Sequence, residues 1–165
     1  MSTATLDQHH VEALQRAARE ILESMVSMAP TSVTEEPEES SSFHDEVIGL
    51  LGFTGTRTGT VVVRTTEALA RTVAARMLMM EASEIGSFAE AADAFGEVVN
   101  MLAGNFKNAW VAAGNRMDLA MPNVIHHGAV KVHSDGPGCV RSRVRVVLDA
   151  GVVDVGVHFE PGPSA

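Results

Sequence analysis

The sequence predicts an α+β fold, a two-layer sandwich in which helices cover one face of a mostly antiparallel sheet. Three stretches place apolar residues at helical spacing, and about six shorter stretches are rich in β-branched residues. The strand-like stretches follow one another at hairpin distances and do not alternate strictly with helices, which favours antiparallel pairing. The 165 residues, 45% of them apolar, are enough for a single domain over residues 1–165 with its own core.

Composition and charge exclude several classes of function. A net charge of −9 argues against a surface that binds nucleic-acid phosphates. No apolar run reaches the roughly 20 residues that span a membrane, and the first ten residues lack the basic and apolar regions of a signal peptide. Cys139 is the only cysteine, and its strand-like neighbours favour a buried, unreactive thiol. We therefore expect a cytoplasmic protein without nucleic-acid or membrane partners.

The first part of the chain predicts a helix, an acidic loop and a hairpin. Residues 29–42 collect Pro, Ser, Thr and Glu with almost nothing to bury, which predicts a mobile acidic loop that is a linker or a functional tether. Residues 47–53 and 58–64 are strand-like, and the glycine-containing segment between them predicts a hairpin. A phosphate-binding loop is excluded because no Gly-Lys-Ser/Thr follows. The helix, within residues 7–27, has helically spaced apolar residues at Val11, Leu14, Ala18, Ile21, Leu22 and Met25.

Thr66 is predicted to cap a second helix. A third, longer helix is predicted for residues 87–114, and four more strands are expected after it. Two of them lie at residues 119–127 and 129–133, and clear alternation predicts a hairpin from 140–148 and 153–159. The hairpin has one apolar face and one charged face. On the charged face, the arginines are expected to form ion pairs across strands with Asp154 and Glu160. This is favoured over contact with an anion or a partner protein. The arginines are Arg141, Arg143 and Arg145.

The long central helix is predicted for residues 87–114. Ser87 and Glu90 have the spacing of a capping box, and Gly114 suits the left-handed position just past a helix end. One broad flank is apolar and is predicted to be buried. It holds Phe88, Ala91, Phe95, Val98, Val99, Leu102, Phe106, Ala109 and Trp110.

The opposite flank of this helix is a narrow polar stripe made of Asp93, Glu97, Asn100, Gly104, Lys107 and Asn108. Periodicity alone favours an ordinary solvated face. The composition points elsewhere, because Asn and Gly weaken helices, Gly by about 1 kcal/mol relative to Ala. Gly104 lies one turn beyond Asn100 and would let another backbone approach that amide.

The seven histidines raise the question of a metal site, and the sequence argues against one. His9 and His10, like His126 and His127, are sequence neighbours, so their side chains are expected to point to different faces. No HExxH or CxxC pattern accompanies them. We predict no metal site.

Asp93, Glu97 and Asn100, in the pattern Asp-x-x-x-Glu-x-x-Asn with Pro122 further on, resemble the signature of the CheC/CheX/FliY family of chemotaxis phosphatases. The segments GFTGTRTGTVVV, GEVVNMLAGNFKNAW and MPNVIHHG are similar to the CheX branch, so the resemblance covers roughly residues 43–160. One copy of the motif is present, as in CheX, whereas CheC carries two related halves.

The resemblance implies hydrolysis of the aspartyl phosphate on a CheY-like response-regulator receiver domain. It assigns Asn100 to orienting the attacking water and Glu97 to an ion pair with the receiver's lysine. It also implies a homodimer formed through sheet edges and no cofactor of its own, with Mg²⁺ on the partner receiver. The expected docking residues are Asp93, Gly104, Lys107 and Asn108.

Two other functions remain open at this point. One is an adaptor that binds a receiver without dephosphorylating it. The other is a non-catalytic scaffold like the FliM-type flagellar domains, which share the fold without the motif. The presence of both Glu97 and Asn100 favours the enzyme.

Overall fold

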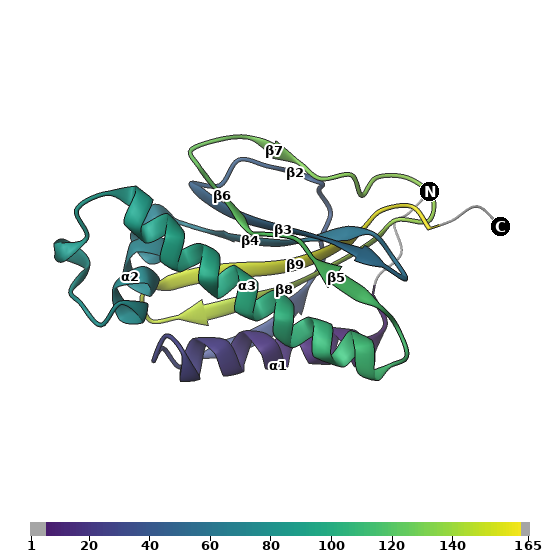
Figure 1. The fold of residues 1–165 in the computed structure, drawn as a ribbon, viewed down its shortest axis with the longest axis horizontal. Helices are drawn as coiled ribbons and strands as arrows, with labels where there is room; N and C mark the ends of the chain where they lie inside the picture. The colour runs from purple at the N-terminus through teal and green to yellow at the C-terminus, as the bar shows by residue number, and fades with distance from the viewer. Residues whose placement is uncertain (1–5, 163–165) are drawn as a thin grey trace.

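The computed structural model describes residues 6–162 and has one main antiparallel sheet with three α-helices on one of its faces (Figure 1). The helices are α1 (Gln8–Ser24), α2 (Glu67–Met77) and α3 (Phe88–Ala112), and a short 3₁₀ helix, η1 (Ala82–Glu84), links α2 to α3. The sheet holds β1 (Ser32–Glu36), β3 (Val47–Gly55), β4 (Gly59–Thr65), β5 (Met117–Leu119), β6 (Asn123–His126), β8 (Val140–Leu148) and β9 (Gly151–Phe159).

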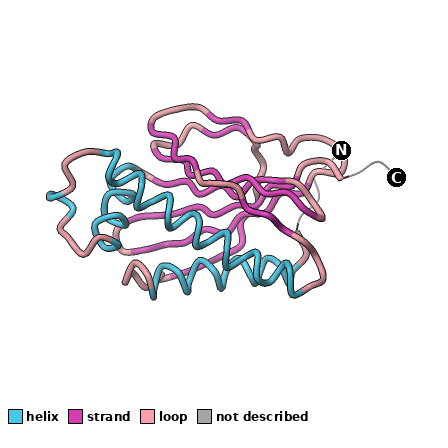
Figure 2. Tube along the Cα trace, viewed as in Figure 1, coloured by secondary structure: helices cyan, strands magenta, loops and turns pink. Residues whose placement is uncertain are grey.

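The strand order is β1-β8-β9-β4-β3-β5, and β6 also pairs with β3. All these pairings are antiparallel, and the separation of the helix and strand layers is clear in Figure 2. The predicted two-layer α+β sandwich is therefore confirmed, with one more strand in the main sheet than expected. None of the helices in the described part of the chain has the length and apolar character needed to cross a membrane.

The N-terminal helix α1 packs against α3 and β8. Asp7 caps it, because its side chain accepts a hydrogen bond from the backbone N–H of His10 at 3.1 Å. That bond is the main reason why the pKa of the Asp7 carboxyl lies below its usual value. Met25, predicted to lie on the buried face, is 48% exposed because the helix ends one residue before it.

The predicted acidic loop at 29–42 contains the edge strand β1, so the expectation of a loop throughout is wrong. Val33 pairs with Val146 of β8 and packs against the core, while Glu35 stays exposed. An edge strand needs backbone partners on one side only, so it forms with few residues to bury. Further along, the Glu38 side chain is 4% exposed and lies 3.5 Å from the Arg64 guanidinium.

A glycine inside β3 determines how closely α3 approaches the sheet. Val47, Leu51 and Phe53 alternate towards the helix layer and join the main core, and Gly49 lies in the same row. A Cβ atom on Gly49 would lie 2.5 Å from Cγ2 of Val99, a distance that would force a shift. The missing side chain thus gives α3 the room in which it packs on the sheet.

Helix α3 begins and ends within two residues of the predicted limits. Ser87 is at the N-cap with an extended backbone, but its side chain makes no capping hydrogen bond, so the predicted capping box with Glu90 is wrong. The sequence pattern allows that box, while the side-chain rotamers decide whether it forms. Gly114 has φ +95°, as predicted for the end of the helix. The buried residues are Ala91, Ala94, Phe95, Gly96, Val98, Val99, Leu102, Ala103, Phe106 and Trp110, so of the predicted set only Phe88 and Ala109 are half-buried.

The face of the sheet opposite the helices carries a small ribbon of two strands, β2 (Ser42–Phe43) and β7 (Val130–Lys131). Phe43 and Val132 pack there against Ile48 and Val62, which lie apart from the main core in a cluster of their own. This second cluster buries the outward row of β3 and β4.

The C-terminal hairpin agrees with the predicted alternation. Arg143 and Arg145 contact Asp154 at 2.9 and 3.2 Å, so the predicted cross-strand pairing is confirmed for this carboxylate. Glu160 differs from the prediction, because its carboxylate pairs with His133 at 2.9 Å.

Thr66 caps α2 as predicted, because its side-chain oxygen accepts a hydrogen bond from the backbone N–H of Leu69 at 3.2 Å.

Candidate functional site

All six residues of the polar stripe reach the surface of α3. Asp93, Glu97 and Asn108 are exposed, whereas Asn100 and Lys107 are half-buried. The large apolar residues of the same helix face the sheet and α1, so the stripe stands on a helix whose other flank is fixed by the core. Gly104 lies in the stripe with no atom within 4 Å of the position of an added Cβ, so the space above it is open.

The N-terminal half of the stripe forms one wall of a surface pocket of about 450 Å³. Asp93, Glu97 and Asn100 line it, whereas Gly104, Lys107 and Asn108 lie further along the helix and do not. The other residues that line the pocket are Ala92, Gly96, Ala120, Met121, Pro122, Asn123 and Val124. The structure thus gathers three of the six predicted stripe residues around one cavity.

The second wall of the pocket comes from the link between β5 and β6. The strand predicted for residues 119–127 is interrupted: β5 already ends at Leu119 and β6 begins at Asn123, because Pro122 between them has no backbone N–H for a sheet ladder. Both pair with β3, and the backbone N–H of Ala120 donates to the Gly52 carbonyl at 2.8 Å. This pairing holds Pro122 beside α3, where its Cγ would lie 3.8 Å from a Cβ on Gly96.

The polar side chains of α3 that line this pocket have no partner among the described residues. Among residues 6–162, the side chains of Asp93, Glu97 and Asn100 take part in no hydrogen bond or ion pair. The two carboxylates therefore give the pocket uncompensated negative charge, which attracts cationic groups. The Asn100 amide keeps its donors and its acceptor for another molecule.

Sequence reasoning gave no site role to six of the lining residues, and Gly96 and Met121 show why. Gly96 is buried inside a helix, a position where glycine is unfavourable, and that cost was a signal the sequence offered. Met121 is 81% exposed at the rim of the pocket, and no local pattern marks it, because its place follows from the pairing of β5 and β6 with β3.

The structure also contains a buried serine–histidine–carboxylate chain that sequence reasoning missed. The Ser134 hydroxyl lies 2.9 Å from Nδ1 of His158, and Nε2 of His158 lies 3.3 Å from a Glu38 oxygen. Ser134 and His158 are both 0% exposed, so no substrate reaches the hydroxyl and the chain is a structural network. Cys139 is equally buried, as predicted, and this burial raises the pKa of its thiol.

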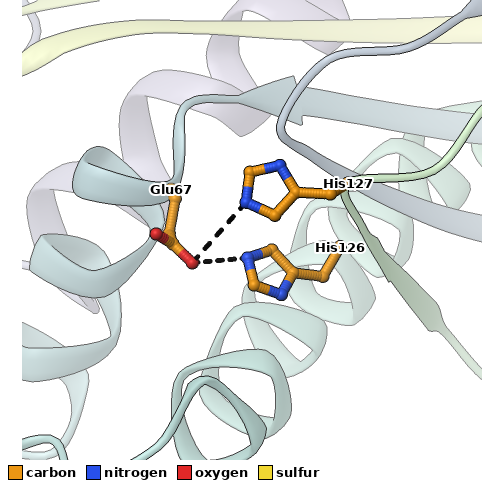
Figure 3. Close-up of side chains that lie close together, drawn as sticks. All are labelled: Glu67, His126 and His127. Carbon is orange, nitrogen blue, oxygen red and sulfur yellow. Dashed lines mark hydrogen bonds and ion pairs between the residues drawn. The ribbon is translucent and has the colours of Figure 1, made fainter.

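The prediction that the side chains of His126 and His127 point to different faces is wrong. His126 and His127 both point towards the carboxylate of Glu67 (Figure 3). Strand neighbours alternate, but His127 follows the end of β6 and has φ 54°, in the left-handed region. The turn of the backbone at this residue brings the two imidazoles to one side.

Comparison with known protein families matches residues 47–141, more than half of the 165 residues, to the chemotaxis phosphatase CheX. This match includes both strands of the first hairpin, the whole of α3 and Pro122. A comparison with curated protein sequences found no match.

Solved structures of similar fold include the chemotaxis protein CheX from Desulfovibrio desulfuricans, with a TM-score of 0.76 and 22% identity over 92% of this chain and 99% of that one. A complex of CheX with CheY, BeF₃ and Mg²⁺ from Borrelia burgdorferi matches with a TM-score of 0.75 and 20% identity over 92% and 97%. FliY from Thermotoga maritima matches with a TM-score of 0.58 and 13% identity over 94% and 91%. At these identities the likeness concerns the fold. Because the family match covers more than half of the chain and the whole of the candidate site, the chain belongs to the CheX family of chemotaxis phosphatases.

Proposed function

We propose that this protein hydrolyses the aspartyl phosphate of a CheY-like response-regulator receiver domain. The observation that carries the proposal is the pocket at the N-terminal half of the stripe, in which Glu97 and Asn100 stand one turn apart without partners among residues 6–162. Family membership and the existence of a solved CheX–CheY complex support the choice of substrate. The place of action that fits this substrate is the cytoplasm.

Asn100 is the proposed water-positioning residue. An aspartyl phosphate is an acyl phosphate and already reactive, so catalysis needs a water held in line with the phosphorus more than it needs a nucleophile from this chain. A primary amide suits that task because it can donate to one group and accept from the water at the same time. Asn100 is half-buried on a helix fixed by Phe95 and Val99, so its position is well defined.

Glu97 is the proposed contact to the receiver's lysine. Its carboxylate is exposed and no cation among the described residues neutralises it. A lysine from the partner would supply the missing positive charge, and the ion pair would lose water when the two surfaces close. Asp93, one turn earlier, is proposed to assist docking through the same negative field.

The remaining stripe residues are proposed docking contacts outside the pocket. The open space above Gly104 allows the partner's backbone to approach α3, and Lys107 and Asn108 extend the polar surface beyond it. Met121 adds an exposed apolar side chain at the rim, of the kind that is commonly buried at the centre of an interface. The chain is proposed to need no cofactor of its own, with Mg²⁺ held by the receiver.

The homodimer stays a proposal that rests on the sheet edges. Within residues 6–162, β1 forms one edge of the main sheet, and β5 and β6 form the other. Pairing two copies edge to edge would cover unpaired backbone groups. Sedimentation equilibrium measures the mass directly, and a monomer at high concentration would contradict the proposal.

The catalytic assignment is tested by phosphate release from a phosphorylated CheY-like receiver. Asn100→Ala is expected to lower the rate about 100-fold, because loss of orientation costs that much, while receiver binding changes little. Glu97→Ala is expected to weaken binding as well as turnover. Asn105→Ala is the matched control, since it removes the same amide from the same helix, off the stripe and outside the pocket, and its rate should stay within about twofold of wild type.

Equal rates for wild type and Asn100→Ala would contradict the catalytic role. If the wild type bound the receiver without speeding phosphate loss, the protein would be an adaptor. Absence of binding to any receiver would point to a scaffold.

A further inference from the structure

Three side chains of metal-binding type converge on the surface beyond the pocket. Glu67 is the first residue of α2, His126 is the last residue of β6, and His127 follows it. One ligand atom from each lies within 4.8 Å of the others, and within residues 6–162 this is the one group of three His, Cys, Asp or Glu residues found that could hold a metal ion (Figure 3).

The backbone is arranged so that both histidines face the same carboxylate. His126 is opposite Val47 in the pairing of β6 with β3, and the backbone N–H of His127 donates to the Glu46 carbonyl at 2.9 Å. His127 then adopts φ 54°, which is uncommon for a residue other than glycine. An unfavourable backbone conformation that the surrounding structure maintains is a reason to look for a function.

The side chains are partly fixed before any ion arrives. The His126 ring stacks on Phe88, with ring centroids 3.7 Å apart and an angle of 18° between the planes. Glu67 lies in the first turn of α2, where the helix dipole favours a negative charge. The ligand atoms remain accessible, because the side chains of Glu67 and His126 are each 32% exposed and that of His127 is 55% exposed.

We propose that Glu67, His126 and His127 form a binding site for Zn²⁺ or a similar first-row transition-metal ion, with water completing the coordination. Two imidazoles and one carboxylate are a ligand set that suits such ions, whereas Mg²⁺ and Ca²⁺ prefer oxygen ligands alone. Bonds of about 2.0–2.1 Å around a tetrahedral Zn²⁺ place ligand atoms about 3.4 Å apart, so the histidine nitrogen already bonded to Glu67 moves away slightly and the other separations shrink by about 1.4 Å at most.

A metal ion at this site would displace the interactions that Glu67 makes with its neighbours. Nε2 of His127 lies 3.9 Å from the Glu67 carboxylate, and Nη2 of Arg71 lies at the same distance from it. His126 makes a direct hydrogen bond with Glu67, and a metal ion would take the place of the shared proton. The ion would tie α2 to the end of the strand that begins at the pocket, and the inference does not depend on phosphatase activity.

The test is a calorimetric titration of ZnCl₂ into the full-length, tag-free protein. Wild type is expected to bind one ion per chain and to melt at a higher temperature with Zn²⁺, because a ligand of the folded state stabilises it. His126→Ala, His127→Asn and Glu67→Gln should each weaken binding at least about tenfold, since even outer-shell changes cost about 10–100-fold. Asn tolerates the left-handed backbone at position 127, so this variant retains the fold.

His133→Ala is the matched control. It removes an exposed imidazole that pairs with the Glu160 carboxylate at 2.9 Å, just as His126 pairs with Glu67. Unlike the Glu67 cluster, this pair has no second histidine among the described residues. Its Zn²⁺ affinity should stay within about twofold of wild type. Absence of stoichiometric binding, or equal affinity in wild type and the three cluster variants, would overturn the proposal and leave an imidazole–carboxylate pair only. Equally tight binding of MgCl₂ would overturn the assignment to transition metals.

Discussion

The two flanks of α3 differ in whether their side chains find partners within the described chain. On the inner flank, Phe95, Val99 and Phe106 are at most 1% exposed and pack in the main core. On the outer flank, Glu97 and Asn100 reach the surface and have no hydrogen-bond or ion-pair partner in residues 6–162. The chain itself completes the inner flank, whereas the polar groups of the outer flank are open to solvent and to other molecules. One helix can therefore be fixed by the core and still present unpaired polar groups.

The largest expected effect tests the inner flank. Phe95→Ala should lower the free energy of unfolding by about 3–5 kcal/mol, because it removes a ring that is 1% exposed and leaves a cavity between α3 and the sheet. Urea denaturation followed by circular dichroism measures this. Asn108→Ala on the outer flank is the control and should change stability by less than about 0.5 kcal/mol. A similar loss in both variants would remove the distinction between the flanks.

A smaller effect is expected where the inner flank touches β3. Gly49→Ala should cost about 1–3 kcal/mol of stability, since the new Cβ would lie 2.5 Å from Cγ2 of Val99. The same measurement on the Gly49→Ala, Val99→Ala double variant should give a loss smaller than the sum of the two single losses. Gly86→Ala, where an added Cβ meets nothing within 4 Å, is the control. Strict additivity at positions 49 and 99 would show that the predicted overlap does not limit the packing.

The smallest effect on stability is expected on the outer flank. Gly104→Ala has open space for its methyl group and should raise the free energy of unfolding by up to about 1 kcal/mol through helix propensity. If a receiver docks closely there, the same methyl group should weaken binding about tenfold, equivalent to roughly 1.4 kcal/mol. Titration of the receiver by fluorescence anisotropy measures the affinity. Thr72→Ala in α2, which also raises helix propensity, should leave affinity unchanged, and an unchanged affinity for Gly104→Ala would place the interface elsewhere.

Much of the fold could be predicted because its signals are local. The limits of α3, the first hairpin and the C-terminal hairpin follow from periodicity and turn residues within each segment. The strand β1 could not be predicted in the same way, because it lies at an edge and its partner β8 is more than 100 residues away in the sequence. Pro122 was tied to the motif by family resemblance alone, and its position against Gly96 is a result of the sheet pairing of β5 and β6.

The polar stripe of α3 was determined by the sequence itself, because the helical repeat fixes which side chains share a face. Only the tertiary structure decided what surrounds that face. The pairing of β5 and β6 with β3 adds the second wall of the pocket, and the left-handed backbone at His127 turns two neighbouring imidazoles towards Glu67. These arrangements depend on contacts between distant segments and on a single backbone dihedral angle, neither of which the local pattern of residues specifies.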